Sequence, residues 1–403
     1  MDNSQASIDV ANSHNQPRSN GRGITSGFSA SLVGIGLARF AYTPLLPAII
    51  DAGWFDASKA TYLGAANLAG YLLGALSGRW FVQKTSTVFS LRFMMLLASI
   101  AFLACAFPVS YIWFFGWRLL SGIAGGALMV LAAPAVLAHV PASKRGMAGG
   151  IIFMGVGVGV AASGTVVPLL LQMGLKQTWM GLGLISLLFT AIAWSGWPSQ
   201  DIKPISVTGH PRASHTTTLL ALYVEYALNA VGWVPHMIFL VAFVAHGLGQ
   251  GLAAGSEYWV LFGVGATLGP LLAGVLADRV GFGTALRLSL ILDGVSVCIP
   301  ALGASAPWLM ASSVVVGAFV TGTVPLVLGR VHELLAHHPA QQAGAWRTAT
   351  VGFALTQAMG AYGFSYLFTS SDGNYALLFL IGAGAIALGF VINIAAACLN
   401  TKR

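Results

Sequence analysis

Repeated apolar runs of about 20 residues dominate this chain of 403 residues. A helix of that length crosses the hydrocarbon layer of a bilayer, which is roughly 30 Å thick. Because lipid offers no water to backbone N–H and C=O groups, these long runs must be helices. Only 7% of the residues are charged, against about 25% in soluble domains, and 57% are hydrophobic. The sequence therefore predicts an all-α integral membrane protein.

The apolar runs predict twelve transmembrane helices in two sets of six. They cover residues 24–50, 59–80, 87–107, 112–137, 146–171, 177–197, 217–243, 253–276, 284–303, 307–330, 343–368 and 375–399. The polar residues 1–23 are expected to form a disordered tail, and the polar residues 198–216 link the sixth span to the seventh. We therefore expect an N-terminal bundle at 24–197 and a C-terminal bundle at 217–399, in a protein that works as a monomer.

The distribution of lysine and arginine predicts the orientation in the membrane, because cytoplasmic loops carry an excess of these residues. With the N-terminus inside, the outer side carries only Lys59 and Lys176. The cytoplasmic side then carries Arg18, Arg22, Arg79, Lys84, Arg92, Lys144, Arg145, Lys203, Arg212, Arg279, Arg287, Arg330, Arg347, Lys402 and Arg403. We expect a plasma membrane protein, in the inner membrane of a bacterium, with both termini in the cytoplasm.

Two short segments recur at an almost constant offset, which indicates an internal repeat. The segment "GALSGRW" at 74–80 matches "GVLADRV" at 274–280, an offset of 200. The segment "HVPASKRG" at 139–146 matches "HHPAQQAG" at 337–344 with an offset of 198 when Pro141 and Pro339 are aligned. Both pairs lie at equivalent cytoplasmic ends, so the two halves are predicted to be parallel repeats of one six-helix unit.

These segments resemble the major facilitator superfamily. The stretch "GVLADRVGFGTALR" (274–287) resembles the signature between its helices eight and nine, and "RLLSGIAGGA" (118–127) resembles its helix-four pattern. The stretches "GLARFAYTPLLP" (36–47) and "YLGAANLAGYLLGAL" (62–76) are similar to the YbfB/YjiJ-type branch. The resemblance implies two pseudo-symmetric bundles that transport a small molecule by alternating access. The helix-five signature of drug–proton antiporters is only half present, because "GVGVG" (155–159) lacks a following Gly-Pro pair.

Arg39 is the most informative single residue, because a guanidinium inside a span costs at least about 2.5 kcal/mol. It lies twelve residues before Asp51, or about 18 Å along a helix, which places it near the middle of the membrane. It is expected to bind an anionic substrate or to pair with a proton-exchanging carboxylate, although a structural ion pair is the alternative. Pro44 and Pro47 are expected to bend this helix around the site.

Arg118 and Glu225 are candidates for proton coupling or charge relay together with Arg39. The resemblance implies such a role for Arg118. The alternative interpretation is that Arg118 lies at the membrane interface and reaches the outer headgroups. Glu225 lies about 12 Å into span seven. A lone carboxyl group in a low-dielectric environment can load and release protons near neutral pH. The alternative for Glu225 is a permanent ion pair. Asp293 in span nine is expected to be a structural partner.

Several polar residues on spans one, two, seven and eleven are candidates for substrate binding. Each one alone is more typical of a hydrogen bond between helices, but together they suggest a site. The substrate-binding candidates are Arg39, Tyr42, Asn67, Asn229, His236 and Gln357.

A separate set of residues is predicted to form a cytoplasmic gate. An acid can cap a neighbouring helix N-terminus, and an arginine can bridge the halves. The predicted gate residues are Gly274, Asp278, Arg279, Gly74 and Arg79. Gly78 replaces the aspartate of the first repeat, so the corresponding latch in the N-terminal half is expected to be weaker.

Other classes of protein have little support in the sequence. The segment "HELLAH" (332–337) places its histidines five residues apart, whereas the zinc-protease motif needs four, and no phosphate loop is present. We expect no enzyme, metal, cofactor or nucleic-acid partner. The leading function is a proton-coupled secondary transporter; the alternatives are a proton-independent uniporter and a non-transporting membrane sensor. Arg39 favours an anionic substrate, but Glu225 permits a cationic one, so the charge of the substrate stays open.

Overall fold

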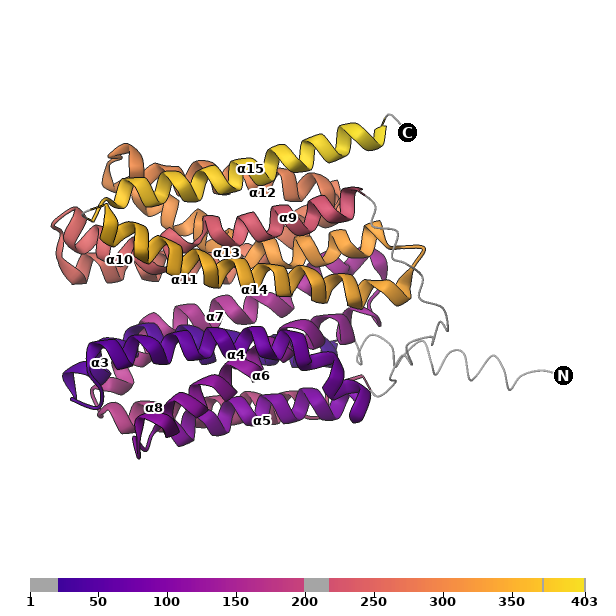
Figure 1. Cartoon of the computed structure of the whole chain (residues 1–403). Helices are drawn as coiled ribbons and strands as arrows, with labels where there is room; N and C mark the ends of the chain where they lie inside the picture. Colours follow the sequence, from indigo (N-terminus) through magenta and orange to yellow (C-terminus); the bar gives the residue numbers. More distant parts are fainter. Residues whose placement is uncertain (1–20, 199–216, 372, 402–403) are drawn as a thin grey trace.

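The structure is a computed structural model that describes residues 21–198, 217–371 and 373–401, and these are almost entirely helical. The helices lie roughly parallel in two groups, one from each half of the chain (Figure 1). The predicted tail and linker fall largely outside the described residues.

Residues 21–31 are helical and lead into the first labelled elements of the N-terminal half. This half contains η1 (Leu32–Leu37), α2 (Ala38–Phe40), α3 (Tyr42–Asp51), α4 (Ala57–Lys84), α5 (Thr87–Cys105), α6 (Tyr111–Leu137), η2 (Ala142–Lys144), α7 (Arg145–Leu171) and α8 (Leu175–Ala193). The C-terminal half contains α9 (Thr217–Gly232), η3 (Pro235–Phe239), α10 (Leu240–Ala242), η4 (Phe243–Gly247), α11 (Gly251–Val280), α12 (Phe282–Cys298), η5 (Ile299–Leu302), α13 (Ala306–Leu334), α14 (Pro339–Ser370) and α15 (Tyr375–Thr401).

Among the described residues, 9 helices are long and apolar enough to cross a membrane. The predicted spans at 59–80, 217–243 and 343–368 correspond to α4, to the segmented helix from α9 to η4, and to α14. These lie within the same two bundles, so the predicted count of twelve fits the observed architecture, and the predicted all-α fold is confirmed.

Side-chain caps show why several helices begin where they do. Asp56, Ser86 and Ser110 accept hydrogen bonds from the backbone N–H groups three residues ahead, at the starts of α4, α5 and α6. Each cap satisfies one of the four N–H groups that the first turn of a helix leaves without a partner. The short polar breaks between the apolar runs therefore contain the residues that restart the helix.

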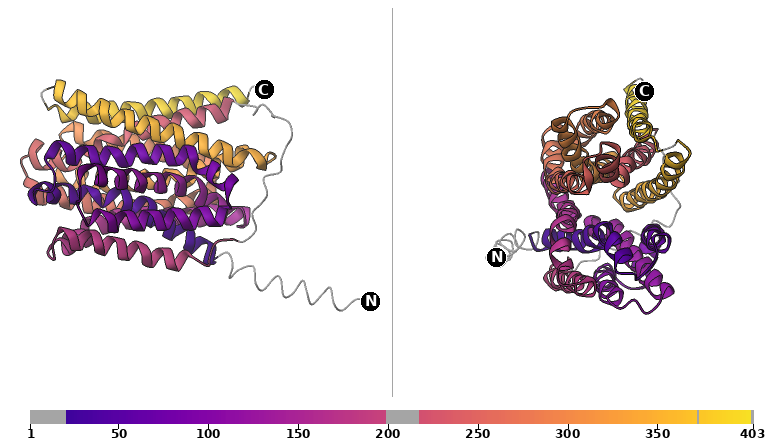
Figure 2. Two further views of the ribbon diagram at one scale, coloured as in Figure 1. Left: turned by 60° about the horizontal axis from the view of Figure 1, so that its bottom comes forward. Right: turned by 90° about the vertical axis from the view of Figure 1, so that its left-hand side faces the viewer.

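The two halves pack most closely where α7 contacts α11 (Figure 2). Glycine makes this approach possible, because a Cβ atom at Gly157 would overlap the backbone carbonyl of Ala266, and one at Gly274 would overlap the carbonyl of Gly146. Small residues of this kind let membrane helices approach at backbone distance. We call the end of the bundle where Arg145 and Arg279 lie the basic end; α15 ends at the same end of the bundle (Figure 1).

The first helix of each half departs from regular α-helical geometry. The wider π-helical turns η1 and η3 occur in the first and in the seventh predicted span. Short π-helical segments are rare and are frequent at functional sites. In this chain they precede Arg39 and contain His236 and Met237.

Candidate functional site

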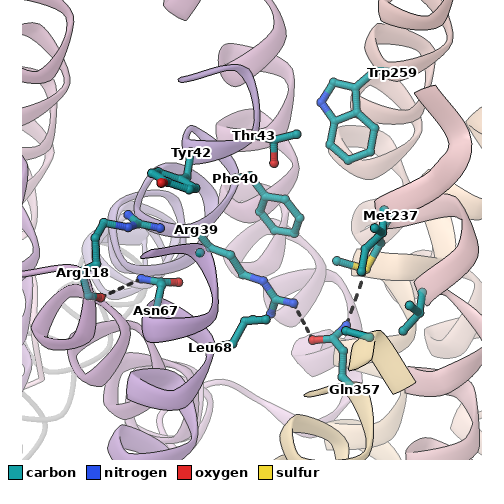
Figure 3. A pocket seen from close by; sticks show the side chains of 14 residues that line it. Arg39, Phe40, Tyr42, Thr43, Asn67, Leu68, Arg118, Met237, Trp259 and Gln357 are labelled. Carbon is teal, nitrogen blue, oxygen red and sulfur yellow. Dashed lines mark hydrogen bonds between the residues drawn. The ribbon is translucent and has the colours of Figure 1, made fainter. Parts of the chain in front are cut away.

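A cavity of about 320 Å³ lies between the two halves (Figure 3). Elements of both halves line it: α2, α3, α4 and α6 from the N-terminal half, and α9–η3, α11 and α14 from the C-terminal half. The lining residues are Arg39, Phe40, Tyr42, Thr43, Gly64, Asn67, Leu68, Arg118, Val234, Met237, Ile238, Trp259, Gln357 and Ala361. The structure therefore brings together five of the predicted site residues, namely Arg39, Arg118, Tyr42, Asn67 and Gln357.

Arg39 extends from α2 across the cavity to the C-terminal half (Figure 3). Its Nη2 donates a hydrogen bond of 2.5 Å to Oε1 of Gln357 on α14. Its guanidinium carbon also lies 5.4 Å from the ring centre of Phe40 and 5.8 Å from that of Tyr71. The polar partner of Arg39 is thus a neutral amide, which leaves the positive charge available to a bound anion.

Arg118 lies at the other side of the cavity on α6 and is only 2% exposed. Its Nη1 donates a 2.9 Å hydrogen bond to the carbonyl of Ala38, and its guanidinium carbon lies 4.3 Å from the ring centre of Tyr42. Its Nε has no hydrogen-bond partner. Because Ala38 precedes Arg39 directly, Arg118 fixes the backbone from which the first arginine projects.

The charges of the two arginines are not neutralised by a described acid. Among the described residues the structure contains two ion pairs, Lys59–Asp56 and Arg330–Glu333, and neither involves the cavity. No aspartate or glutamate occurs among the described residues that line the cavity. The site is therefore a cationic pocket with an apolar and aromatic wall.

Tyr42 and Asn67 hold the N-terminal wall of the cavity in place. The hydroxyl of Tyr42 donates a 2.6 Å hydrogen bond to the carbonyl of Ala60, and Nδ2 of Asn67 donates to the carbonyl of Arg118 at 3.3 Å. On the opposite wall, Nε2 of Gln357 lies 3.5 Å from the sulfur of Met237. Gln357 therefore contacts both Arg39 and the π-helical turn η3.

Asn229 and His236 point away from the cavity, into the C-terminal bundle. Nδ2 of Asn229 donates to Oδ2 of Asp293 at 3.2 Å, and Nε1 of Trp233 donates to the same oxygen at 2.8 Å. Nε2 of His236 lies 2.9 Å from Oγ of Ser312. These two predicted substrate-binding candidates contact α12 and α13 instead of the cavity.

Glu225 also lies behind the cavity wall and is 1% exposed. Its Oε2 accepts a 2.6 Å hydrogen bond from Nδ2 of Asn393 on α15, and Oδ1 of Asn393 accepts a 2.9 Å bond from Nε of Arg287. Its Oε1 has no partner. The structure thus separates Glu225 from Arg39 and Arg118 and connects it through an amide to Arg287.

Asp278 joins the two halves at the basic end. Its Oδ1 accepts a 3.0 Å hydrogen bond from the N–H of Gly146, and its Oδ2 a 2.8 Å bond from the N–H of Met147, both in the first turn of α7. A carboxylate at this position complements the positive end of the helix dipole. The first turn of α7 is therefore capped by an acid from the other half.

The other predicted gate residues surround this contact less closely. Gly274 packs directly against Gly146, one turn of α11 before Asp278. Arg279 is exposed at the end of α11, and Arg79 on α4 is exposed near Gly344 on α14. Gly74 lies within the N-terminal half, against the backbone of Ile123 on α6.

The sequence did not predict apolar members of the site such as Met237 and Trp259, or the partner of Glu225, Asn393. A single amide inside the last apolar span was an available signal for Asn393. For Met237 and Trp259 the sequence offers no signal, because methionine and tryptophan are ordinary residues of an apolar helix.

Comparisons with known proteins agree with this architecture. The model of a family described as "Uncharacterised MFS-type transporter YbfB" matches residues 31–394. The "Inner membrane transport protein YdhP" of Escherichia coli (strain K12) is 25% identical over 373 residues, which are 89% of this chain and 92% of that protein.

Solved structures show the same fold at low sequence identity. A bacterial homologue of the iron transporter ferroportin, in its outward-facing state, has a TM-score of 0.72 and 15% identity, with 94% of this chain and 99% of that chain covered. The E. coli fucose:proton symporter FucP has a TM-score of 0.69 and 15% identity, with coverage of 94% and 98%. The family match covers nearly the whole chain, so this multi-pass membrane protein belongs to the major facilitator superfamily of transporters, in its YbfB-type family.

Proposed function

We propose that the protein is a proton-coupled secondary transporter of a small organic anion with an apolar or aromatic body. One observation carries this proposal: Arg39 and Arg118 line a cavity between the halves, and no acid occurs among its described lining residues. Phe40, Tyr42 and Trp259 offer aromatic surface to the rest of such a molecule. A carboxylate matches the planar fork of a guanidinium, and aromatic faces accommodate a flat hydrocarbon body.

The bound anion takes the place of Oε1 of Gln357 at Arg39. In the present arrangement this amide oxygen is the acceptor that satisfies Nη2 across the cavity. A carboxylate is a stronger acceptor for a charged donor than a neutral amide is. Binding therefore releases Gln357 on α14, and this coupled change in one wall of the cavity is what an alternating-access cycle needs.

The gate acts at the basic end, where Asp278 caps α7. Opening the cavity toward this end requires the two backbone hydrogen bonds from Gly146 and Met147 to break. The proposed gate also includes the residues nearer to or farther from this contact, namely Arg279, Arg79, Gly274 and Gly74.

Proton coupling is assigned to Glu225, with Arg118 and Arg39 as the charges that respond to it. Glu225 is buried, and its Oε1 is free to take a proton. Asn393 binds both Glu225 and Arg287, so the positive charge of Arg287 can stabilise the ionised form of Glu225 through this amide. The alternative is a proton-independent uniporter, which is favoured by the position of Glu225 outside the cavity.

Ligand binding is the first test, because a ligand stabilises the state to which it binds. We would measure the melting temperature of the purified protein with benzoate, phenylacetate and indole-3-acetate, and with the corresponding neutral amides. Stabilisation by the acids and not by the amides is expected. Arg39→Gln should abolish it, whereas Arg92→Gln, at a partly exposed arginine that contacts Trp194, should preserve it. Equal stabilisation by acids and amides would contradict the anion assignment.

Proton coupling needs a separate measurement in proteoliposomes that contain a pH-sensitive dye. A stabilising acid from the first test should change the internal pH when it enters, and Glu225→Gln should abolish this change while counterflow of the labelled acid persists. Uptake that is insensitive to the proton gradient in the unmodified protein would support the uniporter instead.

A further inference from the structure

Asp293 is a fully buried acid in the C-terminal bundle that the proposed cycle does not yet use. It lies on α12, about 16 Å from the start of that helix and therefore near the middle of the membrane. Its exposed fraction is 0%. Its Oδ2 accepts hydrogen bonds from Asn229 and Trp233, whereas its Oδ1 has no partner.

The surroundings of Asp293 do not supply a cation to an ionised carboxylate. Glu225 is on α9, His236 is in η3, and Arg287 is on α12 itself, where it binds Asn393. The ionisable groups of α13 lie at its basic end (330–333), and those of α11 lie at its two ends (257–258 and 278–279); the described part of α15 contains no Asp, Glu, His, Lys or Arg. None of them is bonded to Asp293 among the described contacts. A buried carboxylate without a paired charge is costly.

A second buried oxygen without a partner belongs to the residue that already contacts Asp293. Oδ1 of Asn229 has no hydrogen bond, although Nδ2 of the same amide donates to Asp293. Two acceptor oxygens cannot satisfy each other. A proton on Oδ1 of Asp293 turns this oxygen into a donor, so that an acid and an amide can pair through two hydrogen bonds.

We propose that Asp293 is a proton-binding site, in which Oδ1 of Asp293 holds a proton and donates a hydrogen bond to Oδ1 of Asn229, while Nε1 of Trp233 donates to Oδ2 of Asp293. The proton joins one carboxylate oxygen and leaves from it; no other bond changes.

His236 is a poorer proton acceptor than Asp293, as its hydrogen bonds show. The hydroxyl of Ser312 donates to the carbonyl of Ser296, so Nε2 of His236 must donate to that hydroxyl. The ring is then neutral, and its Nδ1 has no partner. A second proton on Nδ1 would be a buried donor without an acceptor, whereas a proton on Asp293 satisfies two oxygens at once.

The proton site is connected to the cavity through the turn η3. Trp233 directly precedes Val234, which lines the cavity, and Met237 in η3 contacts Gln357. An anion that displaces Gln357 from Arg39 therefore changes a contact of the segment that also holds Trp233 against Asp293. This coupling rests on the proposed transport function, but the proton site does not.

Infrared spectroscopy of the purified, substrate-free protein tests the site directly. A protonated carboxylic acid has a carbonyl stretch that is separate from the amide and carboxylate bands and that shifts in deuterated water. Glu225→Gln serves as the background, because it removes any band from a protonated Glu225. At neutral pH we expect the band in Glu225→Gln, and we expect the double variant Glu225→Gln/Asp293→Asn to lack it. Absence of the band in Glu225→Gln, or its persistence in the double variant, overturns the assignment.

A second variant keeps the test decisive if Asp293→Asn does not fold. Asn229→Leu removes the acceptor of the proposed hydrogen bond, so the carbonyl band should move toward the frequency of an unbonded acid. An unchanged frequency overturns the pairing. Folding of Asp293→Asn is itself expected, because its Nδ2 can donate to Asn229 where the acid proton did.

The coupling through η3 is tested by the rate at which this proton exchanges with deuterium. Gln357→Ala removes the contacts with Arg39 and Met237 and should change the exchange rate severalfold. Thr356→Val is the matched control, because Thr356 lies on the same helix and bonds the carbonyl of Ala227 on α9, away from η3. Equal rates in Gln357→Ala and in the unmodified protein would contradict the coupling, whatever the outcome of the transport assays.

Discussion

The two halves of this protein share one fold but place their buried charges in opposite ways. In the N-terminal half the half-buried Arg39 and the buried Arg118 are cations, and both reach the central cavity. In the C-terminal half the buried acids Glu225 and Asp293 lie behind the cavity wall. Glu225 binds Asn393 on α15, and Asp293 binds Asn229 on α9. The pseudo-symmetric repeat thus carries asymmetric chemistry.

The difference has a physical consequence for a transporter. An acid in the cavity would pair with the arginines and compete with an anionic substrate, whereas an acid behind the wall can change its protonation without occupying the site. Arg39 and Gln357 connect the two halves, because their hydrogen bond joins α2 to α14 across the cavity. We therefore propose that the N-terminal half recognises the substrate and that the C-terminal half responds to protons.

The largest effect is expected when an acid is introduced into the cavity. Gln357→Glu should form an ion pair with Arg39 in place of the present amide contact, and a bound carboxylate would have to break it. We expect the affinity for the stabilising acids to fall by about 100-fold, equivalent to roughly 2.7 kcal/mol. Isothermal titration of the purified variant measures this, with Thr356→Val as the control on the same helix. An unchanged affinity would mean that the anion does not bind at Arg39.

A smaller loss is expected when the second cation is removed. Arg118→Met deletes the hydrogen bond to the carbonyl of Ala38 and the contact with the ring of Tyr42. A charge-assisted hydrogen bond to the acid, at the lower end of the range of about 1.5–3 kcal/mol, is lost with Arg118, so the affinity for the acid should fall by about 10-fold. Titration against the same acid checks this. Retention of full affinity would show that Arg118 has only a structural role.

A still smaller effect is expected at the contact between the halves. Asp278→Asn keeps one acceptor for the first turn of α7 but loses the charge that complements the helix dipole. Loss of part of a helix cap costs about 1 kcal/mol, which is a severalfold shift in the balance between gate states. Labelling of a cysteine introduced at Met147 should become severalfold faster in the variant. The corresponding acid-to-amide substitution Glu333→Gln is the control, because Glu333 caps α12 within one half.

Much of the fold was predictable because the bilayer leaves few solutions. Apolar runs of fixed length and the polar breaks at Ser86 and Ser110 predict where helices lie and begin, and the repeat around Asp278 predicts two related halves. The positions of Arg39, Arg118, Tyr42, Asn67 and Gln357 at the cavity followed from the cost of polar groups in lipid, which favours a polar interior.

The direction in which polar residues of the seventh span point was not predictable. Asn229 and His236 were predicted as substrate-binding candidates, but they face α12 and α13. A regular helix turns by 100° per residue, whereas the π-helical turn η3 changes this phase from Pro235 onward, which affects His236 but not Asn229. Asn229 faces α12 because it binds Asp293 there. The sequence contains Pro235 but not the register that follows it, so the face of each later residue depends on tertiary packing.

The smallest expected effect concerns Asp56. Among the described side chains of the N-terminal half, Asp56 is the acidic one. It caps α4 from an exposed position and pairs with Lys59. Protonation of this acid should therefore not change ligand binding in the cavity. The backbone N–H of Lys59 is the main cause of its lowered pKa, followed by the charged side chain of Lys59. A lowered pKa in the folded state means that the stabilisation is present above the unfolded pKa, about 3.9, and is lost as the pH falls through the folded value. Asp56→Asn should therefore melt slightly below the unmodified protein at neutral pH, and the two melting curves should converge in acid. The affinity for the organic acid should be the same in both proteins at neutral pH, because a charge in the N-terminal half acts on the substrate only when it lies in the cavity.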